Sequence, residues 1–126
     1  MIFVDSCVYI RWLRDRVDLF AELGDHLERG ELITCGVVRA EVLRGVVSVE
    51  ARERMEQLFA AMIEISMGPA FWSEVAELAW ELDRRGEVLP LTDIAIAVGA
   101  RGAGATVITT DLHFKMVPGL KVRAKL

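Results

Sequence analysis

The chain opens with the apolar run Ile2-Phe3-Val4, and Asp5 follows it directly. A short apolar run of this kind predicts a buried β-strand. A carboxylate at the end of a buried strand is costly to desolvate unless a hydrogen-bond donor or a cation pairs with it. Asp5 therefore has two interpretations: it is the N-cap of a following helix, or it is part of a charged site.

Three further acidic residues stand in similar apolar frames. They are Glu41 after Val37-Val38, Asp93 before Ile94-Ala95-Ile96-Ala97, and Asp111 after Val107-Ile108-Thr109-Thr110. Four carboxylates that converge repel one another and need cations between them. Carboxylate oxygens are also the ligands that Mg²⁺ prefers in proteins. The four acids together predict a magnesium-dependent site for phosphate chemistry.

Strand and helix patterns alternate along the chain, with no linker and no repeat. Short apolar runs predict strands over residues 2–4, 32–35, 63–66, 106–109 and 120–123. Helical spacing predicts helices over residues 8–14, 19–29, 38–44, 50–61, 69–85 and 93–101, the last capped by Thr92. This order predicts one α/β domain, residues 1–126, with a mainly parallel sheet of four or five strands. Ligands bind such sheets at the carboxyl ends of the strands, where Asp5 and Asp111 are expected.

Structural interpretations stand beside the functional ones. Asp93 suits the first turn of a helix, whose macrodipole favours a negative charge, and Asp111 suits a turn. The hydroxyls of Ser6, Thr109 and Thr110 can orient the acids, but we expect them to cap the adjoining helix or turn. His113 is expected to be structural or exposed, and Cys7 to be a packing residue. Zinc-ligand spacing, a nucleophile elbow and a phosphate-binding glycine loop are all missing.

Composition narrows the class of protein. The chain of 126 residues is long enough for one domain, and its hydrophobic fraction of 53% allows a sizeable core. A net charge of −4 argues against a basic nucleic-acid coat protein, while a carboxylate-rich metal site is compatible with it. We find no signal peptide and no apolar run of membrane-spanning length, so a cytoplasmic setting with free thiols at Cys7 and Cys35 is expected.

The four acids and the segments that flank them match the motifs of a known family. The chain resembles a PIN-domain ribonuclease, specifically the VapC-like toxins of bacterial and archaeal toxin–antitoxin pairs. The matching segments are Ile2-Phe3-Val4-Asp5-Ser6, Val38-Arg39-Ala40-Glu41-Val42-Leu43-Arg44-Gly45, Leu91-Thr92-Asp93-Ile94-Ala95-Ile96-Ala97 and Val107-Ile108-Thr109-Thr110-Asp111-Leu112-His113-Phe114. Each segment is short, but all occur in order over almost the whole chain.

The resemblance implies a PIN-like three-layer sandwich and an endoribonuclease that cleaves RNA phosphodiester bonds with Mg²⁺ or Mn²⁺. By motif position, Asp5, Glu41 and Asp93 serve the metal site and Asp111 completes it. The family often has a small polar residue two after the first acid, where this chain has Cys7. The resemblance also implies a homodimer and a cognate antitoxin, which covers the site and often places a basic side chain against the acids.

Two other functions remain open from the sequence. A catalytically silent module with this fold would serve protein contacts, although the presence of all four acids counts against it. An aspartyl-phosphate phosphatase would use Asp5 as nucleophile after the first strand. Such enzymes typically begin with a D-x-D motif, and Cys7 stands where the second Asp would be.

Overall fold

The sheet at the centre of the molecule is entirely parallel. The computed structural model describes all of residues 1–126. Five strands pair in the order β3-β2-β1-β4-β5. They are β1 (Ile2–Val4), β2 (Leu32–Cys35), β3 (Ile63–Ile65), β4 (Thr106–Ile108) and β5 (Lys121–Arg123). The predicted α/β class and the mainly parallel sheet are confirmed.

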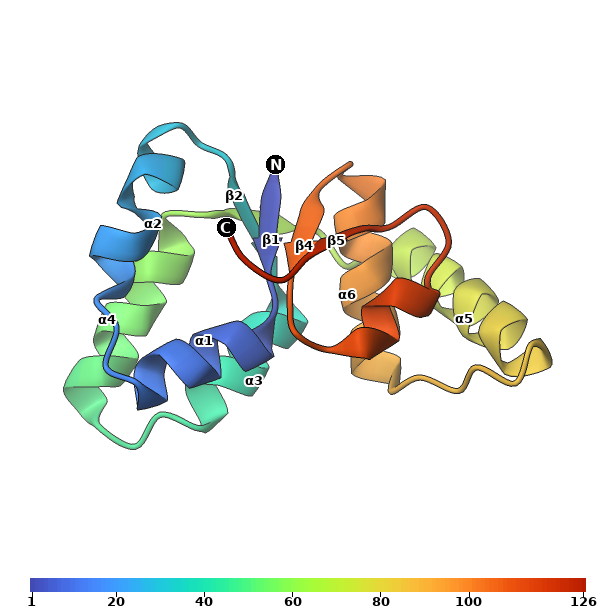
Figure 1. The fold of residues 1–126 in the computed structure, drawn as a ribbon, viewed down its shortest axis with the longest axis horizontal. Coiled ribbons are helices and arrows are strands. Elements are labelled where there is room, and N and C mark those ends of the chain that lie inside the picture. The colour runs from blue at the N-terminus through green and yellow to red at the C-terminus, as the bar shows by residue number, and fades with distance from the viewer.

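Helices cover both faces of this sheet and make three layers (Figure 1). On one side lie α1 (Ser6–Arg14), α2 (Leu19–Glu28), α3 (Gly36–Arg44) and α4 (Val49–Ala60). On the other side lie α5 (Pro69–Arg84) and α6 (Leu91–Gly102). A short 3₁₀ helix, η1 (Leu112–Met116), follows β4. None of the helices is long and apolar enough to cross a membrane.

Local sequence explains several of the helix boundaries. Asp18 caps α2 by accepting a hydrogen bond from the backbone N of Ala21 at 3.2 Å, as expected for an acidic N-cap. Ser48 caps α4 in the same way through the backbone N of Ala51 at 3.3 Å. Pro69 occupies the first turn of α5, where a missing N–H costs nothing. These residues fix where the outer helices begin. The apolar faces of the helices then fill the core.

The start of α6 differs from the prediction. The helix begins at Leu91 and has Pro90 at its N-cap position, because the backbone N of Ile94 donates to the carbonyl of Pro90 at 3.1 Å. Thr92 therefore lies inside the first turn and does not cap the helix. The helix η1 was also not predicted, because five residues in this segment lack a periodic apolar pattern.

The core is one cluster of buried residues, and α6 runs through it. Every residue from Ile94 to Ala100 is buried, so this helix is covered on all sides. Gly99 allows the close approach that this burial needs, since a Cβ there would lie 3.2 Å from Ile65 Cδ1. The tight packing fixes the start of α6, and with it Asp93, relative to the sheet.

The strand order reverses at β1. From β1 the chain moves outward through β2 to β3, and then returns across the sheet to β4 on the other side of β1. Open parallel sheets bind ligands at the carboxyl edge beside such a switch point. Asp5 follows β1 and Asp111 comes shortly after β4, so both lie at this edge. Figure 1 shows α1, α3, η1 and the start of α6 gathered there.

Candidate metal centre

Asp5 is a buried carboxylate that the fold supplies with donors. Only 3% of the residue is exposed. It occupies the N-cap position of α1, but its side chain makes no capping hydrogen bond. Instead, Thr109 Oγ1 donates to Asp5 Oδ2 at 2.8 Å and Cys7 Sγ donates to the same oxygen at 3.0 Å. The side-chain N-cap interpretation of Asp5 is therefore wrong, and its Oδ1 keeps only a long contact with Ser6 Oγ at 3.4 Å.

The hydroxyl of Thr109 links Asp5 to the segment after β4. It accepts a hydrogen bond from the backbone N of Asp111 at 3.0 Å while donating to Asp5. Thr109 makes the turn contact that the sequence predicts. The same hydroxyl also orients the carboxylate of Asp5. Cys7 likewise contacts Asp5 and does more than pack. Burial and the hydrogen bond to Asp5 raise the pKa of the Cys7 thiol, so the thiol stays protonated and can donate.

Asp93 and Asp111 meet around His113. Asp111 is the N-cap of η1, and its Oδ1 accepts a hydrogen bond from the backbone N of His113 at 2.9 Å. His113 Nδ1 lies 3.2 Å from Asp93 Oδ2 and 3.2 Å from Asp111 Oδ1. One ligand atom of each of the three side chains lies within 4.8 Å of the others. His113, which was expected to be structural or exposed, is partly exposed and lies between two of the predicted site residues.

The electrostatics of Asp93 show that the acids act on one another. Burial raises the pKa of the Asp93 carboxyl above its ordinary value, and the hydrogen bond from His113 opposes this increase. The negative charges of Asp111 and Asp5 raise the pKa of Asp93 further. Asp5 is therefore close enough to Asp93 to influence its titration, although it is outside the group of three.

Glu41 is the predicted residue that stands apart. It is half-buried on α3, and its charge raises the pKa of the Cys35 thiol, after the larger effect of burial. Its carboxylate is not among the three that come within ligand distance of one another. The nearby basic side chain of Arg39 is paired with Glu64 of β3, Nη1 to Oε2 at 2.6 Å. Glu41 thus lies on a helix at the same edge of the sheet, without a contact to the other acids.

The donor set suits a divalent cation. Asp93 and Asp111 each offer a carboxylate oxygen, and His113 offers an imidazole nitrogen, all partly open to solvent. Oxygen and imidazole ligands together hold many divalent metal ions. The exposed fraction of the His113 side chain is 42%, so an ion and its water can reach the group. The side chains present therefore fit a divalent metal.

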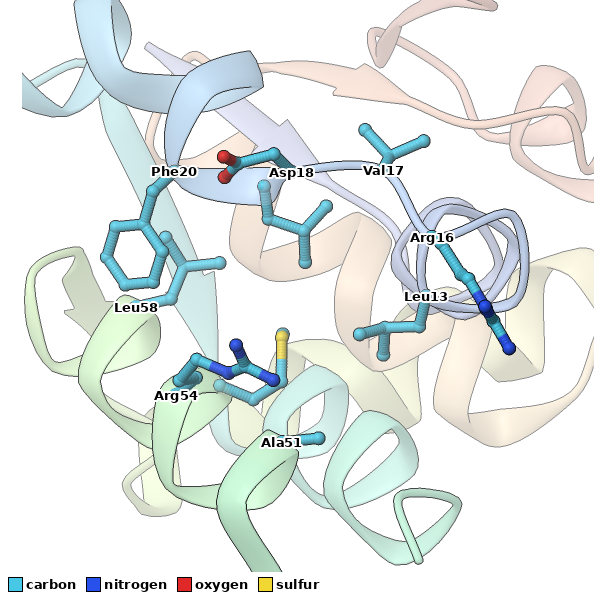
Figure 2. Close-up of a pocket in the computed structure, with 10 residues that line it drawn as sticks. Leu13, Arg16, Val17, Asp18, Phe20, Ala51, Arg54 and Leu58 are labelled. Atoms are coloured by element: carbon cyan, nitrogen blue, oxygen red, sulfur yellow. The ribbon is translucent and has the colours of Figure 1, made fainter. Parts of the chain in front are cut away.

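A groove lies on another part of the surface, between α4 and the turn from α1 to α2 (Figure 2). Its volume is about 450 Å³, and most of its lining is hydrophobic. Figure 2 shows Phe20 beside Leu58 at one end, with Arg54 reaching over the floor from α4. None of the four acids lines this groove. The groove is a concave, mostly apolar surface whose polar lining consists of the basic Arg16 and Arg54 and the acidic Asp18.

The fold and the acidic edge define an α/β protein with a candidate metal centre at the switch point of a parallel sheet. A family model for the PIN domain matches residues 2–120, and the chain belongs to this family. No match is found among curated proteins.

Solved structures similar to this chain include several toxin–antitoxin complexes. VapBC2 from Rickettsia felis, bound to a promoter DNA fragment, is 20% identical with a TM-score of 0.78, over 98% of both chains. DNA-bound VapBC from Salmonella typhimurium is 16% identical with a TM-score of 0.78, over 97% of this chain and 96% of that one. VapBC-1 from nontypeable Haemophilus influenzae is 18% identical with a TM-score of 0.74, over 98% and 97%. These similarities show a shared fold along nearly the entire length.

The crowding of Asp93 gives a prediction about its titration. The Asp111→Asn substitution removes a neighbouring negative charge, so the pKa of Asp93 should fall toward its ordinary value. His113→Gln should move it the other way, because the hydrogen bond that lowers the pKa is lost. Carboxyl-detected NMR titration of the metal-free protein measures both changes. A pKa of Asp93 that stays the same in both variants would contradict the arrangement.

The same shift has a consequence for stability. A carboxyl group whose folded-state pKa is raised binds its proton more tightly in the folded protein than in the unfolded one. The Asp93 carboxyl thus adds to the free energy of unfolding at pH values below its ordinary, unfolded-state pKa. This contribution is lost as the pH rises through the raised pKa of the folded state. Asp93→Asn should therefore flatten the pH dependence of unfolding in this window, as measured by denaturant titration at several pH values.

Proposed function

We propose that this PIN-domain protein is a metal-dependent endoribonuclease and the toxin of a VapBC-type toxin–antitoxin pair. The observation that carries the proposal is the convergence of Asp93, Asp111 and His113 at the switch point, beside the buried Asp5. The fold shared with VapBC structures supports the toxin assignment. The free thiols at Cys7 and Cys35 are compatible with action in the cytoplasm.

In this proposal each acid has its own part. Asp93 and Asp111 hold a divalent ion, Mg²⁺ or Mn²⁺. Asp5 is oriented by Thr109 and Cys7 through Oδ2, so that Oδ1 would be available to the cation. Glu41 acts from α3, where it binds metal or orients water. When bound, the ion neutralises charge on the scissile phosphate and lowers the pKa of a water molecule.

The RNA is held by basic side chains around the acidic edge. Lys115 is exposed on η1, two residues after His113, and Arg11 and Arg14 lie on the helix that follows Asp5. Such side chains contact phosphates without reading the sequence of bases. They supply local positive charge in a chain whose net charge of −4 repels RNA.

The alternatives fit the geometry less well. A phosphatase nucleophile must reach phosphorus, whereas Asp5 is almost fully buried and its Oδ2 already accepts two hydrogen bonds. A silent binding module has no need for three ligand atoms within 4.8 Å of one another. Calorimetric titration with Mg²⁺ or Mn²⁺ separates the module from the nuclease, since the module should bind neither ion.

Removal of one ligand should abolish RNA cleavage. We expect Asp93→Asn to reduce cleavage of an RNA panel by about 10²-fold or more, because a neutral amide is a weaker ligand for the ion that stabilises charge in the transition state. EDTA should have the same effect, and added Mg²⁺ or Mn²⁺ should restore the wild type alone. Asp83→Asn, an exposed acid at the end of α5, is the matched control and should cleave normally. Full activity of Asp93→Asn or of the EDTA-treated protein would reject the nuclease.

The groove of Figure 2 supports the antitoxin part of the proposal. Its apolar floor suits the hydrophobic face of a helix, and Arg16 and Arg54 at the rim suit acidic residues on that helix. Under this proposal, the partner would be the product of a small neighbouring reading frame. An acidic amphipathic segment of this partner would sit in the groove while another part covers the acids.

Charge reversal in the groove tests this interaction. Arg54→Glu should weaken binding of the co-expressed antitoxin about tenfold, as expected when a favourable charge pair becomes repulsive. Arg52→Glu lies on the same helix outside the groove lining and is the matched control. Affinities are measured by calorimetry at two salt concentrations. Equal affinity of the two variants would show that the segment binds elsewhere.

We also propose a homodimer that uses the outer face of α5. Trp72 and Trp80 are 43% and 57% exposed there, about two turns apart on a helix that otherwise packs on α6. Large exposed aromatic side chains on one face are typical of an interface. Sedimentation should give a mass of two 14.0 kDa chains, and Trp80→Ser should shift it toward one. Val47→Ser, at a fully exposed position outside α5, should leave the dimer intact.

A further inference from the structure

We propose that His113 is itself a metal ligand, through Nδ1, and that it makes the site prefer a first-row transition-metal ion over Mg²⁺. The proposal rests on the metal-dependent function proposed above and names the ion class that the site selects. It extends the ligand set beyond the four acids to a nitrogen donor.

The distances around His113 are those of adjacent ligands. His113 Nδ1 is 3.2 Å from both Asp93 Oδ2 and Asp111 Oδ1. An octahedral ion with bonds of about 2.1 Å separates neighbouring ligand atoms by about 3 Å. The nitrogen is thus spaced as an adjacent ligand to each oxygen, and the two oxygens lie within 4.8 Å of each other. The three atoms could therefore bind one ion together.

The fold holds His113 in this place from two sides. The backbone N of His113 donates to Asp111 Oδ1 at 2.9 Å, which ties the start of η1 to the carboxylate beside the ring. The next residue, Phe114, is fully buried and anchors the helix in the core. The backbone on both sides of the ring is thereby fixed, and the ring itself lies between Asp93 and Asp111. Preorganisation of this kind favours binding through the nitrogen.

The chemistry of the nitrogen sets the preference. Mg²⁺ binds oxygen ligands and loses its waters reluctantly, so an imidazole adds little to its affinity. The affinity of mixed nitrogen and oxygen sites rises along the first-row series from Mn²⁺ through Fe²⁺ and Co²⁺. A site of two carboxylates and one imidazole therefore favours a first-row transition-metal ion over Mg²⁺ more strongly than a site of carboxylates alone. Without His113 the remaining donors are those of an ordinary Mg²⁺ site.

The chain offers a simple spectroscopic test, because it contains only two histidines, His26 and His113. Mn²⁺ is the probe. Pulsed EPR of the Mn²⁺-loaded protein should show coupling to an imidazole nitrogen, and this coupling should be absent in His113→Gln. His26→Gln is the matched control and should keep the nitrogen coupling. His26 lies on α2 and pairs with Glu31 at 2.8 Å.

Competition between ions tests the selectivity in the same proteins. Wild type should bind Mn²⁺ at least about tenfold more tightly than Mg²⁺, and His113→Gln should lose about tenfold in Mn²⁺ affinity with little change for Mg²⁺. An equal loss for both ions would mean that His113 only positions the carboxylates, and no loss would mean that it is not a ligand. Either result overturns the proposal.

These measurements need no RNA, so they separate the two proposals. If the protein binds Mn²⁺ through the His113 nitrogen but cleaves no RNA, the nuclease proposal is rejected and the proposal that His113 is a ligand stands. Metal-dependent cleavage with no nitrogen coupling would reject the ligand and keep the nuclease.

Discussion

The burial of Asp5 is the constraint on which the candidate site depends. A carboxylate at the end of the central strand can be desolvated only when donors or cations surround it. The fold supplies Thr109 and Cys7 on one oxygen and leaves the other with a long contact to Ser6. Because Thr109 belongs to the segment after β4, this hydrogen bond joins the ends of two neighbouring strands. It places the residues that follow β4, including Asp111, at the same edge.

At this edge of the sheet the negative side chains outnumber the positive ones that contact them. Asp5, Asp93 and Asp111 carry negative charge in a partly buried region, and the pKa of Asp93 is raised by burial and by its acidic neighbours. His113 is the one basic side chain that contacts two of them. An arrangement that remains short of positive charge is suited to hold a cation and, through it, a phosphate.

Sequence patterns located most of the fold because they reflect local physics. Apolar runs of three or four residues marked all five strands, and the helical spacing of apolar residues marked the six α-helices. The start of α6 was misplaced because Thr92 is a good cap in isolation, while the carbonyl of Pro90 accepts the first helical hydrogen bond, from the backbone N of Ile94. The first turn of α6 is exposed at Leu91 and Thr92, and no side chain caps it.

The sequence by itself determined the alternation of strands and helices, the position of each acid beside an apolar segment, and the resemblance to the PIN family, which the family model bears out. These features depend on neighbours along the chain. Only the tertiary structure decided that Asp93, Asp111 and His113 meet and that Glu41 stands apart. His113 is separated from Asp93 by 20 positions, and no local pattern records that contact. The packing of α6 against β4 and η1 creates it at the carboxyl edge of the parallel sheet, where ligands bind in such folds.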